Sequence, residues 1–458
     1  MTTPWTTDNL TGKAVTVVGL GKSGLAAARF CREAGARVTV SEAGRADGFG
    51  DAIRQLEPIG VNLEFGAHRP ETLTETELIV LSPGVPHTIA PLAAARQQGV
   101  PVIGEMELAA RFIVEPIAAV TGTNGKTTTT GLLGDMLKTA GIDVFVGGNI
   151  GNPLIEYVAS GRKADWVVVE VSSFQLDTMT SFHPRIGCLL NISEDHLDRY
   201  PDFESYAASK WGLFRHQTTE DTAIVNGALS NLGAPAMPMP GQTLYFNGAP
   251  EGCQPAAHLS DTALTLSVGS GRGNVTIDLA AMPLVGRHNA ENVAAAALAA
   301  LAAGAEPTGI QAALDNFKAL PHRVTFVREL KGVRYYDDSK ATNVDAVARA
   351  LDSFQQPVVL IMGGRDKGGS YRVIENRIRE KVCQLIVMGE AAETIAETFR
   401  PVVPVAPAAH MAAAVRLAAQ TAREGQVVLL SPACASFDMY ADYHQRGKDF
   451  CRHVQQLA

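Results

Sequence analysis

The sequence predicts an α/β protein of three domains, each built on a mostly parallel sheet. Two observations indicate this class. Short apolar, β-branched runs alternate with helical patterns along most of the chain, and glycine-bearing loops join a strand to a helix at residues 19–24 and 121–128. The length supports several domains, because 458 residues exceed what one ordinary hydrophobic core holds.

Residues 1–104 are expected to form the first domain. A β-branched strand over residues 14–18 runs into G-L-G-K-S-G, and a helix over residues 25–34 and a second strand follow. Glu42 lies just past that second strand, where an acid binds ribose hydroxyls in dinucleotide-binding folds. The pattern predicts a Rossmann-like domain. Taken alone it favours a nicotinamide cofactor, although the same loop holds any diphosphate and its glycines also permit close helix packing.

The second predicted domain, residues 105–319, contains the motif on which the functional prediction depends. An apolar run over residues 117–120 leads into T-G-T-N-G-K-T-T and then into a helical stretch. The backbone N–H groups of such a loop bind polyphosphate, while Lys126 adds a positive charge and Thr127 offers a hydroxyl to Mg²⁺. Val120 replaces the first glycine of the usual pattern. The motif predicts a P-loop ATPase-like domain, and an ordinary strand-to-helix turn is the alternative.

Candidate metal ligands follow two later strands of the second domain. Glu170 ends the apolar run 165–170, where it is either a natural Mg²⁺ ligand or a strand-end cap. His196 lies in an acid-rich stretch after another apolar strand, which favours a site role over a structural one. Lys210, on a predicted helix over residues 203–214, has the pattern of a surface charge.

The pattern changes between about residues 222 and 287. Short strands alternate there with Gly- and Pro-rich turns such as residues 237–241, which predicts a small antiparallel insertion or a loop-rich edge. Asn292 then lies near the start of an alanine-rich helix, where it either reads a base edge or only occupies the first turn.

Residues 320–458 are expected to form a third, Rossmann-like domain. Three β-rich runs, at residues 358–362, 385–388 and 427–430, are separated by helical patterns and end in polar or glycine-rich loops. This order predicts an open parallel sheet with its loops on one edge. Arg323, after a preceding helix, is either a phosphate clamp or a surface charge.

Composition excludes several classes of function. The chain is 46% hydrophobic and 19% charged, which is typical of a soluble globular protein, and its net charge of −8 gives no electrostatic case for nucleic acid or an anionic membrane. We expect no secretory signal and no membrane insertion, since the longest apolar run is short and alanine-rich. The six cysteines lack C-x-x-C spacing, which favours reduced thiols in a cytoplasmic protein over a zinc site or disulfides.

Two phosphate-type loops in one chain suggest two nucleotide-bearing ligands, for example ATP and a nucleotide-linked substrate. No nucleophile system stands out, so phosphoryl transfer supported by Mg²⁺ and positive side chains is the predicted chemistry. A nicotinamide-dependent oxidoreductase is the alternative from residues 19–24, but it leaves Lys126 and Thr127 unexplained. A nucleotide-gated binding protein, in which the loop only switches conformation, is a third class.

Eight motifs in order along nearly the whole chain resemble those of the Mur ligases of bacterial peptidoglycan synthesis: GTNGKTTT, GGNIG, EVSSFQL, SEDHLDRYPDFESYAASK, GRHNAEN, PHR, DDSKATN and SPACASFD. The resemblance implies a cytoplasmic, monomeric, ATP-dependent ligase that adds D-glutamate to UDP-N-acetylmuramoyl-L-alanine through an acyl phosphate and a tetrahedral intermediate, releasing ADP and phosphate. A ligase of the same family with another acceptor amino acid is the alternative. The DNPR-type stretch typical of the diaminopimelate-adding relative is absent.

The resemblance also implies roles for individual residues. The catalytic set would be Lys126, Glu170, His196 and Lys210, with two Mg²⁺ ions held by Thr127, Glu170, His196 and a carbamate formed from CO₂ on Lys210. ATP would contact Gly122, Thr123, Asn124, Gly125, Lys126, Thr127, Thr128, Asn292 at the adenine, Arg323 at phosphate and Asp338 at the ribose. The UDP-linked substrate would contact Ser23, Glu42, Ser82, Gly84, Asn149 and Ser172. D-Glutamate would contact Thr342, Lys367, Ser436 and the backbone near Tyr443.

Overall fold

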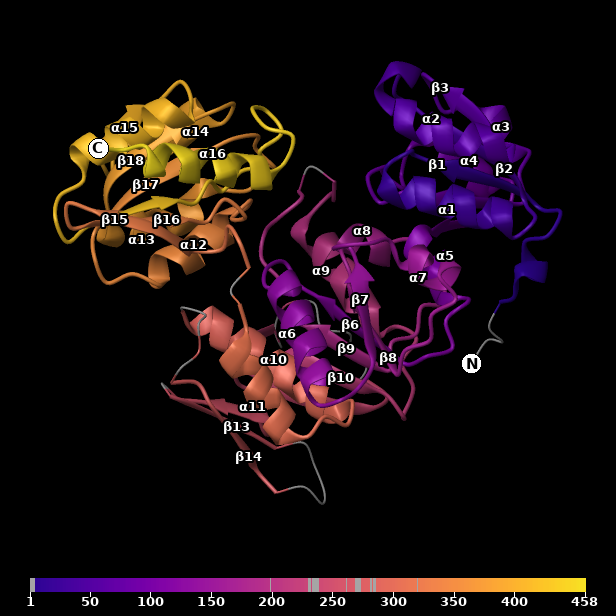
Figure 1. The fold of residues 1–458 in the computed structure, drawn as a ribbon, viewed down its shortest axis with the longest axis horizontal. Helices are drawn as coiled ribbons and strands as arrows, with labels where there is room; N and C mark the ends of the chain where they lie inside the picture. The colour runs from indigo at the N-terminus through magenta and orange to yellow at the C-terminus, as the bar shows by residue number, and fades with distance from the viewer. Residues whose placement is uncertain are drawn as a thin grey trace.

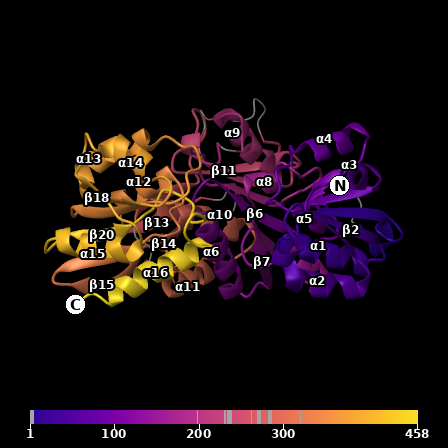
Figure 2. The ribbon, with the colours of Figure 1, turned by 90° about the horizontal axis from the view of Figure 1, so that it is seen from above.

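The computed structural model describes residues 5–197, 199–229, 232, 239–260, 262–267, 273–280, 282, 286–318 and 320–458. Figure 1 shows three lobes, with the C-terminal lobe at the upper left, the N-terminal lobe at the upper right and the central lobe below them. Viewed from above, the three lobes follow one another in chain order, with the central lobe in the middle (Figure 2). The predicted turn at residues 237 and 238 and the predicted boundary residue 319 lie outside the described residues.

The N-terminal lobe contains a five-stranded parallel sheet in the order β3-β2-β1-β4-β5. Its strands are β1 (Ala14–Val18), β2 (Arg37–Glu42), β3 (Asn62–Phe65), β4 (Leu78–Leu81) and β5 (Val102–Gly104). Its helices are α1 (Lys22–Glu33), α2 (Gly50–Leu56), α3 (Pro70–Thr74) and α4 (Ala90–Gln97). Helix α1 begins inside the predicted glycine loop, and Glu42 is the last residue of β2 and not a residue beyond it.

The central lobe contains a six-stranded parallel sheet in the order β11-β10-β9-β6-β8-β7. Its strands are β6 (Ile117–Thr121), β7 (Val144–Gly148), β8 (Trp166–Glu170), β9 (Ile186–Leu189), β10 (Thr222–Asn226) and β11 (Gln242–Phe246). The prediction of antiparallel structure was therefore wrong for β10 and β11. Four of the five β10 residues are buried, as expected of a parallel strand covered on both faces.

A small antiparallel sheet confirms the remainder of that prediction. Strands β12 (Ala257–Leu259), β13 (Ala263–Leu266) and β14 (Val275–Asp278) pair in antiparallel register. Helix α10 (Arg287–Ala302) contacts α6 (Lys126–Thr139), β9 and β10 on one side and β12 and β13 on another. This position explains why α10 is apolar on all its faces beyond the first turns: it is buried between two sheets.

The C-terminal lobe contains a mixed sheet in the order β15-β16-β20-β17-β18-β19, in which only β15 runs antiparallel. Its strands are β15 (Thr325–Leu330), β16 (Val333–Asp337), β17 (Val358–Gly363), β18 (Val382–Met388), β19 (Val405–Pro407) and β20 (Val427–Leu430). Helices α12 (Val344–Asp352), α13 (Glu375–Lys381), α14 (Ala392–Phe399), α15 (Met411–Thr421) and α16 (Tyr443–Gln455) cover it. The predicted third sheet is confirmed.

Several shorter helices connect the lobes and the site. Helix α7 (Leu154–Ala159) packs against α1 and α5 (Glu105–Ala110), so the N-terminal lobe rests on the central one (Figure 1). Helices α8 (Ser173–Leu176), α9 (Phe203–Trp211) and α11 (Pro307–Asn316) complete the central lobe. The α/β fold class is confirmed, whereas the domain boundaries after residues 104 and 319 stay a prediction. No described helix combines the length and apolar character needed to cross a membrane.

Candidate active site

The glycine loop between β6 and α6 has the backbone of an anion-binding turn. Gly125, directly before α6, has a left-handed φ of 86°, and a Cβ there would collide with the side chain of Asn292. The helix begins directly after Gly125, at Lys126. Asn191, two residues after β9, holds the loop because its amide group accepts from the Asn124 N–H at 2.8 Å and donates to the Asn124 carbonyl at 3.0 Å.

Lys126 folds back over this loop. Its Nζ donates to the carbonyl oxygens of Gly122 and Thr123, both at 2.8 Å. Burial is the main cause that lowers its pKa, opposed by the carboxylates of Glu170 and Asp195. The amine therefore lies at the mouth of the loop, where a polyphosphate would meet it.

Lys210 is buried, and the interpretation of this residue as a surface charge was wrong. Its side chain is 1% exposed, and its Nζ donates to the Gly122 carbonyl at 2.9 Å, the same oxygen that Lys126 contacts. The Nζ also lies 4.6 Å from the centre of the Tyr206 ring. Burial, and then the charge of Lys126, lowers the pKa of Lys210 well below its ordinary value. The geometry therefore favours a neutral amine.

Glu170 presents an unused oxygen to the same region. Its carboxylate is 2% exposed; Oε1 accepts from the Asn149 amide at 2.8 Å, and Oε2 has no hydrogen-bond partner. A buried carboxylate oxygen without a partner is costly, so this atom fits a cation. Among the described residues, no three His, Cys, Asp or Glu side chains form a metal cluster by themselves. A metal here would need further ligands such as Thr127, on the first turn of α6, or phosphate oxygens.

His196 faces the site from the loop after β9. Its backbone has a positive φ of 56°, and its ring packs edge-on against Phe174 at 4.8 Å between centroids. Burial lowers its pKa to about 3, so the imidazole is neutral and can ligate a metal. Asp195, next to it, is 7% exposed.

Residues of the C-terminal lobe reach directly onto the phosphate loop. Lys367 Nζ lies 3.3 Å from Asp195 Oδ1, and the Asn343 amide donates to Asp195 Oδ2 at 3.0 Å. Asn124, in the loop itself, donates to Asp345 Oδ2 at 2.9 Å. The carboxyl ends of the central and C-terminal sheets thus meet at Asp195.

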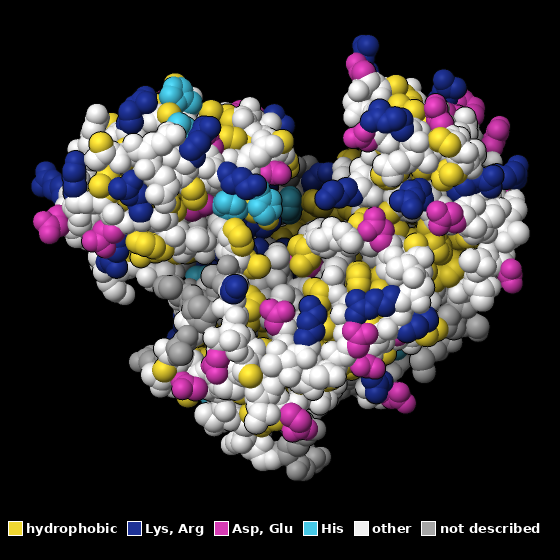
Figure 3. All heavy atoms as spheres, in the orientation of Figure 1, with side chains coloured by type: hydrophobic (Ala, Val, Ile, Leu, Met, Phe, Trp, Pro, Cys, Tyr) yellow, Lys and Arg dark blue, Asp and Glu magenta, His cyan; other side chains and the backbone are white. Residues whose placement is uncertain are grey.

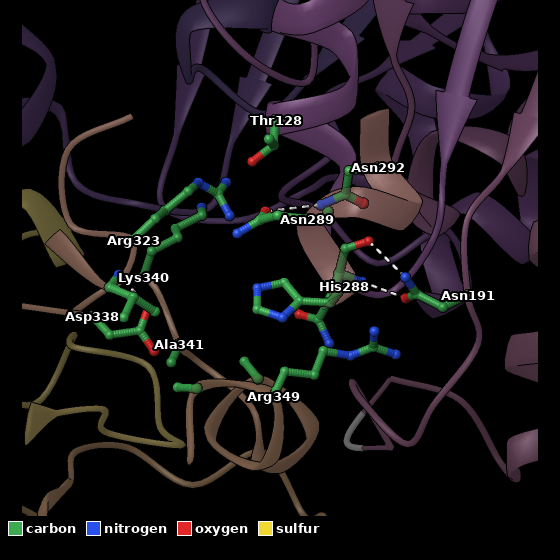
Figure 4. A pocket seen from close by; sticks show the side chains of 15 residues that line it. Thr128, Asn191, His288, Asn289, Asn292, Arg323, Asp338, Lys340, Ala341 and Arg349 are labelled. Carbon is green, nitrogen blue, oxygen red and sulfur yellow. Dashed lines mark hydrogen bonds between the residues drawn. The ribbon is translucent and has the colours of Figure 1, made fainter. Parts of the chain in front are cut away.

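A pocket lies at this junction (Figure 4). Gly125 and Thr128 of the phosphate loop line it together with Asn292, Arg323 and Asp338, the three residues matched to adenine, phosphate and ribose contacts. Figure 4 shows Arg323, Lys340 and Asp338 on one side and His288 and Asn289 of α10 on the other. The face drawn in Figure 3 is hollowed between the N- and C-terminal lobes, and Lys, Arg and His side chains gather there.

Two titratable groups in this pocket are shifted by burial. Asp338 is 6% exposed; Oδ2 accepts from Ser431 at 2.9 Å, Oδ1 accepts from the Val324 N–H at 3.2 Å, and burial raises its pKa to about 7. Burial lowers the pKa of Lys340 to about 8, and its Nζ lies 4.1 Å from the centre of the Tyr443 ring.

The residues matched to the acceptor pocket lie at the carboxyl end of the third sheet. Lys367 Nζ lies 3.5 Å from Thr342 Oγ1, so the structure brings these two together. Ser436 is 3% exposed in the loop after β20, and Tyr443 begins α16, with its carbonyl accepting from Ser339 Oγ at 2.9 Å.

The residues matched to the UDP-linked substrate divide between two lobes. Ser23, on α1, and Ser82 and Gly84, after β4, lie around the first glycine loop. Both oxygens of Glu42 are already bonded to backbone N–H groups, those of Leu20 and Gly44, each at 2.7 Å.

The remaining two, Asn149 and Ser172, follow β7 and β8 of the central lobe. A small pocket between the two lobes is lined by Ser82 and Gly104 of the N-terminal lobe and by Phe174, Gln175 and Arg199 of the central lobe, but not by Asn149 or Ser172.

Comparison with known proteins matches all three lobes to one family. Residues 13–104 match the "Mur ligase MurD-like, N-terminal domain", residues 120–300 the "Mur ligase middle domain" and residues 322–434 the "Mur ligase, glutamate ligase domain". A UDP-N-acetylmuramoylalanine–D-glutamate ligase of Desulfatibacillum aliphaticivorans is 51% identical over 98% of this chain and 99% of its own. The chain belongs to the Mur ligase family.

Further relatives agree with this Mur ligase assignment. The ligase of the same name from Desulfosudis oleivorans is 50% identical over 97% of this chain and 96% of its own. Among solved structures, UDP-N-acetylmuramate-alanine ligase of Thermotoga maritima has a TM-score of 0.57 at 17% identity, covering 97% of this chain and 99% of its own. The MurF ligase of Thermotoga maritima in complex with ADP has a TM-score of 0.57 at 16% identity, covering 99% and 97%. These structures establish the fold alone.

Sequence reasoning missed several residues of this Mur ligase site. These residues contact the phosphate loop, contact each other across the lobes or line the pocket; they are Asn191, Asp195, His288, Asn343 and Arg349. The motifs SEDHLD, GRHNAEN and DDSKATN contain three of them, Asp195, His288 and Asn343. The signal was present as polar residues after strands, but only the folded chain shows which of them face the loop.

Proposed function

We propose that this Mur ligase uses ATP to join D-glutamate to UDP-N-acetylmuramoyl-L-alanine in peptidoglycan precursor synthesis, forming an amide and releasing ADP and phosphate. One structural observation supports this proposal independently of the names of the relatives. The phosphate loop around Lys126 and the acceptor-side cation Lys367 lie on either side of the carboxylate of Asp195. An enzyme that activates one substrate with ATP and couples it to a second needs this juxtaposition.

ATP occupies the pocket between the central and C-terminal lobes. The loop from Gly122 to Thr128 surrounds its phosphates with N–H groups, and Lys126 neutralises the transferring phosphoryl group. Arg323 adds a second positive charge, while Asn292 meets the adenine and Asp338 accepts from the ribose hydroxyls. Positioning and charge supply most of the acceleration in such a transfer.

The residues present fit two magnesium ions. Thr127 and the unpartnered oxygen of Glu170 would hold one, and His196 with a carbamate on Lys210 would hold the other. Bound Mg²⁺ would neutralise charge on the phosphates and on the phosphorylated acid. The buried, neutral Lys210 amine supports the carbamate, because only a neutral amine adds to CO₂: the N–C bond forms, a proton is released, and the amine becomes an anionic oxygen ligand.

The two organic substrates approach from opposite lobes. The UDP part binds near Ser23, Glu42, Ser82 and Gly84, and its alanine carboxylate reaches the loop beside Asn149 and Ser172. D-Glutamate binds Thr342, Lys367, Ser436 and the backbone near Tyr443. Its amine attacks the acyl phosphate, giving a tetrahedral intermediate that expels phosphate.

Each substrate-binding region is assigned to one of the predicted domains. The three substrate-binding regions correspond to domains 1–104, 105–319 and 320–458. The enzyme is proposed to act as a monomer in the cytoplasm, where ATP is available.

Acceptor selectivity is the direct test of this function. With ATP, Mg²⁺ and UDP-N-acetylmuramoyl-L-alanine, we expect phosphate release to depend on D-glutamate and to stay at background with L-lysine, diaminopimelate or L-alanine. Coupled measurement of phosphate and amide product checks it. Equal turnover with another acceptor would reassign the substrate, and slow turnover indifferent to every acceptor would favour a nucleotide-gated binding protein.

ATP binding is expected to weaken as the pH falls through 7. The pKa of Asp338 is raised to about 7, so its carboxylate exists above that pH and is protonated below it. A protonated acid is a poor acceptor for ribose hydroxyls, so we expect the KM for ATP to rise about ten-fold from pH 8 to pH 6. Asp338→Asn should flatten this difference although ATP itself still titrates. An equal slope in both proteins would show that Asp338 is not responsible.

A further inference from the structure

A buried tyrosine joins the two loops that present the proposed acceptor residues. The loop after β17 carries Lys367, and the loop after β20 carries Ser436. The hydroxyl of Tyr371 lies 3.1 Å from Asp366 Oδ1 in the first loop and 3.2 Å from Cys434 Sγ in the second. Tyr371 is 4% exposed and Cys434 is fully buried.

The directions of these hydrogen bonds follow from the proton count. Tyr371 has one hydroxyl proton, and it donates this proton to Asp366 Oδ1. The Cys434 thiol then donates to the phenolic oxygen. Burial raises the pKa of Cys434 to about 11, which keeps this thiol protonated near neutral pH.

Asp366 also accepts hydrogen bonds from the backbone at Lys367. The same oxygen, Oδ1, accepts from the N–H groups of Lys367 at 2.7 Å and Gly368 at 3.1 Å. Tyr371 therefore fixes a carboxylate that in turn fixes the peptide carrying the cation. Without it, this exposed, glycine-containing turn would have more conformations available.

A backbone bridge fixes the base of the same two loops. Arg365 N donates to the Ala435 carbonyl at 2.8 Å, and Ala435 N donates to the Arg365 carbonyl at 3.0 Å. The bridge ends before Lys367, whose Nζ lies 3.3 Å from Asp195 Oδ1 and 3.5 Å from Thr342 Oγ1. Tyr371 is thus the side chain that extends the connection to the tip of the loop.

We propose that Tyr371 is a positioning residue for the acceptor amino acid, acting through Asp366 to hold the Lys367 loop in register with the Ser436 loop. The inference rests on the proposed function. It adds that Tyr371 sets the spacing between the two loops that form the acceptor pocket. Tyr371 itself touches no reacting atom. Its effect should therefore be confined to acceptor binding.

Tyr371→Phe tests this directly. Loss of one net hydrogen bond is expected to raise the KM for D-glutamate about five-fold, with kcat at saturating D-glutamate and the KM for ATP within about two-fold of the unsubstituted enzyme. Asp366→Asn keeps an acceptor oxygen and should retain most of the D-glutamate affinity. Steady-state kinetics in each substrate checks both.

Tyr157→Phe is the matched control. Tyr157 is also buried, and its hydroxyl also has two partners, Glu115 at 3.1 Å and the Ala164 N–H at 3.1 Å, but it lies on α7 in the central lobe. We expect this variant to leave the KM for D-glutamate unchanged. An equal rise in both variants would show a general loss of stability and overturn the inference.

Hydrogen exchange gives a readout that does not depend on the acceptor. Amide exchange at residues 363–369 should be faster in Tyr371→Phe and unchanged in Tyr157→Phe. Unchanged exchange in this segment, or an unchanged KM for D-glutamate, would overturn the positioning role. If the unsubstituted enzyme shows no turnover that depends on D-glutamate, the proposed function is wrong. The amide exchange rates at residues 363–369 then test by themselves whether Tyr371 orders the loop.

Discussion

Lys126→Ala is expected to reduce kcat/KM for ADP formation about a thousand-fold or more while the protein stays folded. The amine lies at the mouth of the phosphate loop, with burial lowering its pKa and two carbonyl oxygens holding it at 2.8 Å. A phosphoryl group entering the loop would replace those carbonyls as its partner. Removing the amine leaves developing phosphate charge without its closest protein cation.

The matched control for Lys126→Ala is Lys138→Ala, since Lys138 lies exposed in the last turn of the same helix, α6. It should leave turnover unchanged. Circular dichroism and thermal unfolding should be close to those of the unsubstituted enzyme in both variants, because neither side chain is part of the apolar core. Normal turnover in Lys126→Ala would remove the phosphate-loop assignment.

Lys210→Ala is expected to lose activity by about a hundred-fold or more and to regain part of it with formate or acetate. The amine is 1% exposed and shares the Gly122 carbonyl with Lys126, and no described carboxylate forms an ion pair with it. Two amines at one oxygen are mutually unfavourable when both are charged. A carbamate on Lys210 removes that repulsion and supplies an anionic ligand, which a small carboxylate can mimic in the truncated variant.

Two further measurements separate this role from a structural one. Lys210→Met keeps the volume and removes the amine, so it should be inactive and show no recovery with carboxylates, because the space is filled. Protein equilibrated with ¹³C-bicarbonate should show a carbamate carbon resonance that is absent from both variants. Activity undiminished in Lys210→Met, or an unchanged spectrum, would contradict the modification.

The hydrophobic pattern of the chain made most of the sheets predictable. β17 and β20 are short runs rich in Val, Leu and Ile, the pattern favoured by internal parallel strands, and the structure buries both fully. The prediction failed at β10 and β11, because turn-rich sequence around them resembled that of the true antiparallel strands nearby. Register with β9 is a long-range property that local patterns do not contain.

The functional residues, too, were only partly predictable from the sequence. The glycine loop and its Lys126 were visible because backbone conformation and helix start are encoded locally, through Gly125 and the residues around it. The burial of Lys210 was not visible in the sequence, since it depends on the distant phosphate loop, whose Gly122 carbonyl accepts from its Nζ, as well as on the neighbouring ring of Tyr206 in its own helix.

The sequence by itself therefore determined the strand-loop-helix units, the phosphate loop and, through its motifs, the family. Only the tertiary structure decided which polar groups meet: the Asp195–Lys367 contact, the unpartnered oxygen of Glu170 and the Tyr371 connection between two loops. The physical reason is that these depend on desolvation and on contacts between segments far apart in the chain, neither of which a local pattern of residues specifies.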